Sequence, residues 1–222
     1  MRIKDIGNMR KNTLKNNLAE YELTEELSNP IKVIGIGGCG CNMVDHIYRE
    51  GVADMDLIVC NSDGQRLKQS PVPAKILLGT TGIGCGNNPE VAKNMAIESK
   101  EKIKKIIMPN TKMLFIVAGM GGGTGSGAAP VVAEIAKSIT DDDGKSKIHV
   151  GAVVTMPFSF EGAFRKKKAE EGLQELKKHV DSITIMNNDE VMNPDVGYRE
   201  ALNAVDDMAF EAIKRMIEAF KG

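Results

Sequence analysis

The sequence predicts an α/β fold in which a mostly parallel sheet is flanked by helices and the chain ends in a long helix. Short apolar runs rich in β-branched residues alternate with longer segments of helical periodicity, the rhythm of βα units. Glycine clusters directly follow three of these runs. The last segment places its apolar residues at the i, i+3, i+4 spacing of one helical face.

The expected elements follow from these patterns. Strands are predicted at Lys32–Ile36, Asp56–Cys60, Lys75–Leu78, Met113–Ala118, Ile148–Thr155 and Ser182–Met186. Helices are predicted near Cys41–Glu50, Pro89–Ile107, Ser126–Ile139 and Gly162–His179, with a long terminal helix over 198–221. Pro89, at a first helical position with an acidic residue behind it, marks one helix start.

The length of 222 residues suits a single domain, since domains take roughly 100–200 residues. Residues 1–30 contain few large apolar residues, are basic up to Lys15, acidic from Glu20 to Glu26, and end in the breaker Asn29-Pro30. We therefore expect an N-terminal extension over 1–30 and one folded domain over 31–222.

Composition excludes several classes of function. The formal net charge is −1, which argues against a dedicated nucleic-acid or membrane-surface binder. No apolar run approaches the roughly 20 residues that span a bilayer, and the N-terminus does not read as a signal peptide. The four cysteines show no disulfide spacing. We expect a cytoplasmic protein with reduced thiols, without nucleic-acid binding or membrane insertion.

The three glycine clusters, Gly35–Gly40, Gly79–Gly86 and Gly119–Gly127, come at the ends of predicted strands. In an open parallel sheet the carboxyl ends of the strands meet at one edge, where ligands bind. Glycine lets backbone amides approach an anion closely, and a helix start behind the loop favours negative charge. The clusters therefore predict one shared phosphate site.

Two kinds of nucleotide fit such a Rossmann-like edge. The first cluster matches G-x-G-x-x-G, and Asp63 stands where a ribose-binding acid is expected, which makes an NAD-dependent oxidoreductase the alternative hypothesis. However, a dinucleotide needs no second phosphate-binding loop, and the sequence offers no evident acid or base for hydride transfer. A P-loop is excluded because Ile139 stands where its first glycine is required. A nucleoside triphosphate held by amides, hydroxyls and a divalent cation fits better.

Several spaced segments carry a family resemblance. These are Gly37–Asn42, Asn61–Gln65, Gly121–Pro130 and Thr155–Gly162. Together they resemble the tubulin/FtsZ family of GTPases, and in particular its bacterial members that act in cell division. The resemblance extends through most of residues 31–222 and implies binding of GTP or GDP, with Mg²⁺ accompanying the nucleotide.

The resemblance assigns roles to particular positions. Phosphate contacts are implied for Gly37, Gly38, Cys39, Gly40, Gly121, Gly122, Gly123, Thr124, Gly125 and Ser126. Ribose and phosphate contacts are implied for Glu161 and Arg165, and guanine contacts for Asn42, Asn188, Leu202 and Asp207. A carboxylate at Asp207 can accept from N1–H and the exocyclic amine of guanine, which favours GTP over ATP.

The chain departs from the family pattern at three places. Cysteines replace glycines at Cys39 and Cys41, which we interpret as small loop residues because a metal site needs about four ligands. Asn187 stands where a proline is usual, and Leu202 where a phenylalanine commonly stacks on the base. The last two leave open a third reading, a structural assembly module with a vestigial pocket.

The resemblance also implies how turnover occurs. In the family, subunits polymerise head to tail, and the next subunit supplies acidic residues from a loop after the long helix. That loop would begin beyond Gly222, so we expect no catalytic residue in this chain, and hydrolysis only when a full-length partner docks. The long helix, which lies between two domains in the family, is expected to expose apolar surface.

Overall fold

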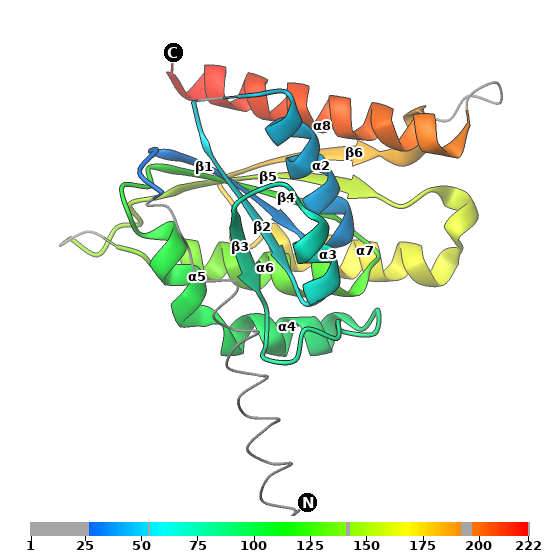
Figure 1. Ribbon diagram of the computed structural model, residues 1–222, viewed down its shortest axis with the longest axis horizontal. Coiled ribbons are helices and arrows are strands. Elements are labelled where there is room, and N and C mark those ends of the chain that lie inside the picture. The colour runs from blue at the N-terminus through cyan, green and yellow to red at the C-terminus, as the bar shows by residue number, and fades with distance from the viewer. Residues whose placement is uncertain (1–26, 53, 141–142, 192–196, 222) are drawn as a thin grey trace, which may run out of the picture.

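A computed structural model describes residues 27–52, 54–140, 143–191 and 197–221. Its centre is a six-stranded sheet in the order β3-β2-β1-β4-β5-β6, with every neighbouring pair parallel (Figure 1). The strands are β1 (Ile31–Ile36), β2 (Asp56–Asn61), β3 (Ala74–Leu77), β4 (Met113–Gly119), β5 (His149–Met156) and β6 (Ser182–Asn187). The predicted α/β fold and the strand positions are confirmed to within one or two residues.

Helices cover both faces of the sheet (Figure 1). The face covered by α2 (Gly37–Arg49), α3 (Gly64–Gln69) and α8 (Tyr198–Lys221) holds one apolar core. The opposite face holds a second core under α4 (Pro89–Glu98), α5 (Lys100–Ile107), α6 (Gly123–Lys137) and α7 (Ala163–Leu176). Two short 3₁₀ helices, η1 (Ser159–Glu161) and η2 (Asn188–Val191), follow β5 and β6.

Alternation along the central strands supplies both cores. Val33 faces the α2 and α8 side, whereas Ile34 faces the α4 to α7 side. Every residue of β1 is buried, as expected for a strand with a helical layer on each face. The ends of these central strands are therefore held in a rigid frame.

The predicted helix over Pro89–Ile107 is two helices, because Ser99 leaves helical geometry (φ −92°, ψ 8°). Its hydroxyl accepts a hydrogen bond from the Gly79 amide at 2.9 Å, which links the break to the loop after β3. The helix α2 also begins earlier than the sequence predicts, at Gly37 instead of Cys41. The beginning of the helix thus lies inside the first glycine cluster.

The end of the expected extension belongs to the fold. Residues 1–26 lie outside the described residues, but Leu27 to Pro30 pack beside the sheet. The buried Lys32 donates to the Leu27 carbonyl at 3.3 Å and to the Pro109 carbonyl at 2.7 Å. The Asn29 amide donates to an Asp56 carboxylate oxygen at 3.0 Å. Contacts with the sheet therefore begin before residue 31.

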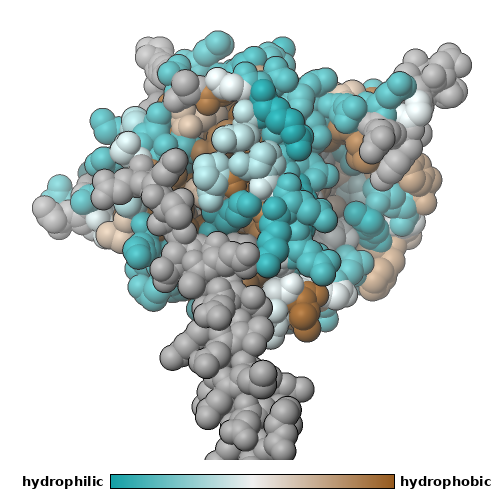
Figure 2. Space-filling model, in the orientation of Figure 1, coloured by the Kyte–Doolittle hydropathy of each residue, from teal (hydrophilic) through white to brown (hydrophobic). Residues whose placement is uncertain are grey.

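The apolar face of α8 is mostly covered, contrary to expectation. Val205, Ala209, Ile213 and Ile217 are buried in the core shared with α2. Among the described side chains of α8, Met208 is the exposed large hydrophobic residue, at 36%. The face in view in Figure 2 is largely hydrophilic, with scattered apolar patches. No helix in the described ranges has the length and apolar character needed to cross a membrane.

Candidate functional site

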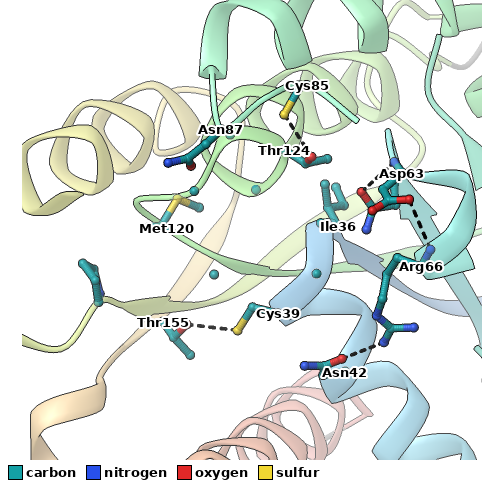
Figure 3. A pocket seen from close by; sticks show the side chains of 18 of the residues that line it. Ile36, Cys39, Asn42, Asp63, Arg66, Cys85, Asn87, Met120, Thr124 and Thr155 are labelled. Atoms are coloured by element: carbon teal, nitrogen blue, oxygen red, sulfur yellow. Dashed lines mark hydrogen bonds between the residues drawn. The ribbon is translucent and has the colours of Figure 1, made fainter. Parts of the chain in front are cut away.

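A cavity of about 620 Å³ opens where β1, β2, β4 and β5 end (Figure 3). Most of the residues predicted to contact the nucleotide line it. They are Gly37, Gly38, Cys39, Asn42, Gly122, Gly123, Thr124, Gly125, Glu161, Arg165, Asn188 and Leu202. Residues from the first, second and third glycine clusters therefore meet around one space.

The helices α2 and α6 both begin at this cavity without a side-chain cap. The residues before them, Ile36 and Gly122, make no capping hydrogen bond. By contrast, Asp63 caps α3, and Asn88 caps α4. The first amides of an α-helix have no partner within the helix, and they carry the positive end of its dipole. Two such helix starts facing one cavity suit an anion.

Three predicted phosphate residues, Gly40, Gly121 and Ser126, support the cavity from behind, outside its lining. A Cβ on Gly40 would lie 2.2 Å from the Val117 carbonyl oxygen, so glycine there lets α2 pack against β4. The Ser126 hydroxyl accepts from the Gly121 amide at 2.8 Å. In the structure these residues therefore make contacts within the protein, and their direct contact with phosphates stays a prediction.

Hydroxyl and thiol groups line the cavity near the starts of α2 and α6. The Thr124 hydroxyl lies 2.9 Å from the Ser62 hydroxyl and 3.4 Å from the Cys85 sulfur. The Cys39 thiol lies 3.7 Å from the Thr155 hydroxyl (Figure 3). Sequence reasoning missed Ser62, Cys85 and Thr155, although each ends or follows a predicted strand or lies in a glycine cluster. Burial raises the pKa of the Cys39 thiol to about 11, so it stays protonated at neutral pH.

Glu161 and Arg165 form a pair at the entrance. One Glu161 oxygen accepts from the Phe158 amide at 2.9 Å, and the other lies 2.9 Å from Arg165 Nη1. The Glu161 side chain is 15% exposed and that of Arg165 48%. The carboxylate is thus fixed by the turn after β5, and it holds the guanidinium at the cavity.

At the other end of the cavity, the structure places two neighbouring carboxylates of α8 differently. Asp206 lines the cavity, whereas Asp207 does not: its carboxylate is 67% exposed and pairs with His46 Nε2 at 2.9 Å. One residue turns a side chain by about 100° around a helix, which separates the two neighbours. Asn188 also lines this end, and its buried Oδ1 has no hydrogen-bond partner among the residues that the structure describes.

The Asp206 carboxyl titrates unusually. Burial raises its pKa to about 6, with nearby Asp207 adding to the rise and His46 opposing it. A carboxylate that is desolvated and lines a cavity, without a hydrogen bond from the described protein, is suited to accept from a ligand. This residue was not among the predicted ones.

A further missed residue, Arg66, lines the cavity beside Asn42. Its Nη2 lies 2.7 Å from Asn42 Oδ1 (Figure 3) and 2.7 Å from Asp45 Oδ2. Asp45 is buried, and it also accepts from the Ser70 hydroxyl. The signal that could have found Arg66 was its place directly after the Asn61–Gln65 segment.

The dinucleotide alternative fails at its key acid. Asp63 Oδ1 accepts from the amides of Gln65 and Arg66 at 2.9 and 3.3 Å, so the carboxylate is used as the cap of α3.

Within the described part of the chain, no group of three or more His, Cys, Asp or Glu residues could hold a metal ion. The Cys41 thiol is buried and contacts the backbone: its sulfur lies 3.7 Å from the Gly35 and Cys60 carbonyl oxygens.

Comparisons with known proteins agree with this geometry. The profile of the tubulin/FtsZ family, GTPase domain, matches residues 30–194. Cell division protein FtsZ of Wigglesworthia glossinidia brevipalpis is 43% identical over 194 residues, which cover 85% of this chain and 48% of that protein. FtsZ 1 of Thermococcus kodakarensis is 40% identical over 202 residues, covering 89% and 52% respectively.

Among solved structures, an empty FtsZ dimer of M. jannaschii matches with a TM-score of 0.77 at 37% identity, covering 92% of this chain and 58% of that one. The chain spans about half the length of the curated relatives it matches. Its paired glycine-rich helix starts, which face one cavity, lie within the matched region. The chain belongs to the tubulin/FtsZ family, and the matched part is the GTPase domain.

Proposed function

We propose that this chain binds GTP and GDP in the cavity, with the phosphates at the starts of α2 and α6. The observation that carries the proposal is the convergence of these two uncapped helix starts on one space. Backbone amides of Gly38, Cys39 and Gly123 to Gly125 are the proposed donors. Glu161 is the proposed acceptor for ribose hydroxyls, and Arg165 the proposed phosphate clamp.

The base is proposed to lie between Asn188, Leu202 and Asp206. The Asp206 carboxylate takes the role expected of Asp207, because it is the one that lines the cavity. An ionised carboxylate accepts from N1–H and the 2-amino group of guanine, a pair of donors that adenine lacks. The partnerless Asn188 Oδ1 supports a ligand here, since buried polar atoms in proteins are normally hydrogen-bonded.

Mg²⁺ is proposed to accompany the triphosphate. This ion prefers oxygen ligands and is commonly bound by substrate phosphates, waters and one or two protein oxygens. The hydroxyls of Thr124 and Ser62, next to the start of α6, are the protein oxygens that fit. The ion would reduce repulsion between the phosphates; the chain itself orients them through its amides.

Assembly and turnover follow as further parts of the proposal. The curated relatives are cell-division proteins, and one solved relative is a dimer. We propose that this chain associates head to tail, with copies of itself or with full-length relatives, in the cytoplasm. Acidic residues of the neighbouring subunit would position the attacking water. Phosphoryl transfer needs that positioning as well as charge neutralisation.

Calorimetric titration of the full chain with GTP, GDP, ATP and NAD, each with and without Mg²⁺, tests the binding. We expect guanine nucleotides to bind at least tenfold more tightly than ATP, and NAD not to bind. Failure to bind any nucleotide in the presence of Mg²⁺ would favour a structural module with a vestigial pocket.

Turnover is tested separately, by phosphate release with and without a full-length relative. We expect hydrolysis by the isolated chain to be negligible. When this chain is mixed with a full-length relative, we expect the GTP turnover rate of the mixture and the length of the relative's polymers to change. Rapid hydrolysis by the isolated chain would contradict the requirement for a partner.

A further inference from the structure

Arg66 fixes the orientation of an amide in the cavity. Its Nη2 donates to Asn42 Oδ1 and to Asp45 Oδ2, each at 2.7 Å. A guanidinium has five N–H donors and no acceptor. The Asn42 amide must therefore turn its oxygen toward Arg66, because the opposite orientation would bring two donors together.

The guanidinium is itself anchored from behind. The Asp45 side chain is 5% exposed, and its second oxygen accepts from the buried Ser70 hydroxyl. The Arg66 side chain is 18% exposed. A buried, hydrogen-bonded ion pair holds its geometry more firmly than an exposed one. The position of Arg66 is thus set by the protein before any ligand arrives.

Asn42 lies at the cavity end of this network. It comes from the second turn of α2 and lines the cavity. Arg66 holds the side-chain oxygen of Asn42. The Asn42 Nδ2 group remains available to a ligand, since no described residue accepts a hydrogen bond from it. The cavity is offered an N–H donor at this point and no acceptor from the same side chain.

We propose that Arg66 is a positioning residue for base specificity: it holds the Asn42 amide so that Nδ2 donates to the 6-oxo group of guanine. This inference rests on the proposed nucleotide binding. Adenine carries an amino group at that position, which would set donor against donor. Asn42 would thus discriminate at position 6 of the base, while Asp206 would accept from positions 1 and 2.

Analogue discrimination tests the inference. Binding of GTP, 6-thio-GTP and ITP is measured for the wild-type chain and for Arg66→Met. The sulfur of 6-thio-GTP is a weaker acceptor at position 6, and ITP lacks the 2-amino group. We expect the wild type to prefer GTP to 6-thio-GTP by about tenfold, the worth of one hydrogen bond. In Arg66→Met this preference should fall to within about twofold, while the GTP to ITP ratio is unchanged.

Lys68→Met is the matched control, because it removes one positive charge from the same helix at an exposed residue outside the cavity lining. It should leave both ratios at their wild-type values. A general loss of structure or charge would weaken all three nucleotides together, so the selective change at position 6 distinguishes positioning from a merely structural role.

A second variant covers the case in which Arg66→Met fails to fold. Asn42→Asp keeps an acceptor for Arg66 but offers the cavity a carboxylate oxygen in place of the N–H donor. We expect its GTP to ATP affinity ratio to fall at least tenfold. If the wild type binds GTP and a folded Arg66→Met keeps the wild-type ratio, the role of Arg66 is overturned and the proposed function stands; where Arg66→Met does not fold, an unchanged ratio in Asn42→Asp overturns it. A wild type that binds no guanine nucleotide overturns both.

Discussion

His46 on α2 and Asp207 on α8 are joined by a contact of 2.9 Å between Nε2 and Oδ1, which holds Asp207 outside the cavity that its neighbour Asp206 lines. His46 also lies edge-on to Phe210, one helical turn further along α8. The ring therefore connects the two helices at the point where the proposed base site begins. The two adjacent carboxylates have separate environments and should have separate roles.

The first prediction compares these carboxylates. Asp206→Asn should weaken GTP binding by about 10- to 100-fold, since hydrogen bonds to a charged group are worth about 1.5–3 kcal/mol. Asp207→Asn removes the same charge one residue away and should change the affinity by less than about threefold, because exposed ion pairs contribute little. Calorimetric titration of both variants measures the difference. The reverse ranking would return the base-reading role to Asp207.

The second prediction is a pH dependence of GTP affinity. The pKa of Asp206 is raised to about 6, so the free carboxyl takes up a proton as the pH falls through that value. A protonated carboxyl offers fewer acceptors to the two guanine donors. GTP affinity should therefore decline from pH 7.5 to pH 5 in the wild type. In Asp206→Asn the same titration should be nearly flat, and a wild-type slope that survives this substitution would assign the effect to another group.

The same shift has an opposite consequence for the stability of the nucleotide-free chain. A folded-state pKa above the ordinary aspartate value of 3.8 means that folding favours the protonated form. The contribution of this group to stability is full below about pH 4 and is lost as the pH rises through about 6. Denaturant titrations of Asp206→Asn should accordingly show a gain over wild type at pH 8 that disappears near pH 4.

Glycine patterns after strands could be recognised from the sequence because they are local. A strand end, a glycine cluster and a helix start occupy consecutive residues, and parallel strands bring such ends together. The glycine loops before α2 and α6 were therefore found, with Gly37–Cys39 and Gly122–Gly125 among the cavity residues, although these helices begin at Gly37 and Gly123 instead of Cys41 and Ser126. The strand positions followed from the same local alternation.

The features that were missed depend on contacts between distant segments. The choice between Asp206 and Asp207 turns on the rotation of α8 against α2, set by His46 and the core residues. The break at Ser99 depends on a hydrogen bond from Gly79, 20 residues earlier. Arg66 acquires its role from Asn42, 24 residues away. Residue types alone carry no such information about partners.

The last prediction compares two glycines of the Gly119–Gly127 cluster: one that only supports the cavity wall and one that faces the proposed nucleotide site. A Cβ on Gly127, which lies outside the cavity lining, would lie 2.0 Å from the Pro89 carbonyl oxygen, so Gly127→Ala forces α6 away from the start of α4. Overpacking of this kind typically costs about 1–3 kcal/mol. The melting temperature should fall by several degrees, at roughly 2–4 °C per kcal/mol for a chain of this size.

Gly122→Ala is the matched substitution. A Cβ there meets no atom within 4 Å, and its φ of −88° suits any residue. Gly122 lines the cavity in front of α6, so the added methyl would occupy space next to the first helix amides. Thermal stability should change by less than about 1 kcal/mol, while GTP affinity falls about tenfold because phosphates can no longer approach those amides. Thermal melts and titrations of both variants distinguish the roles: unchanged GTP affinity in a stable Gly122→Ala would mean that the phosphates lie elsewhere.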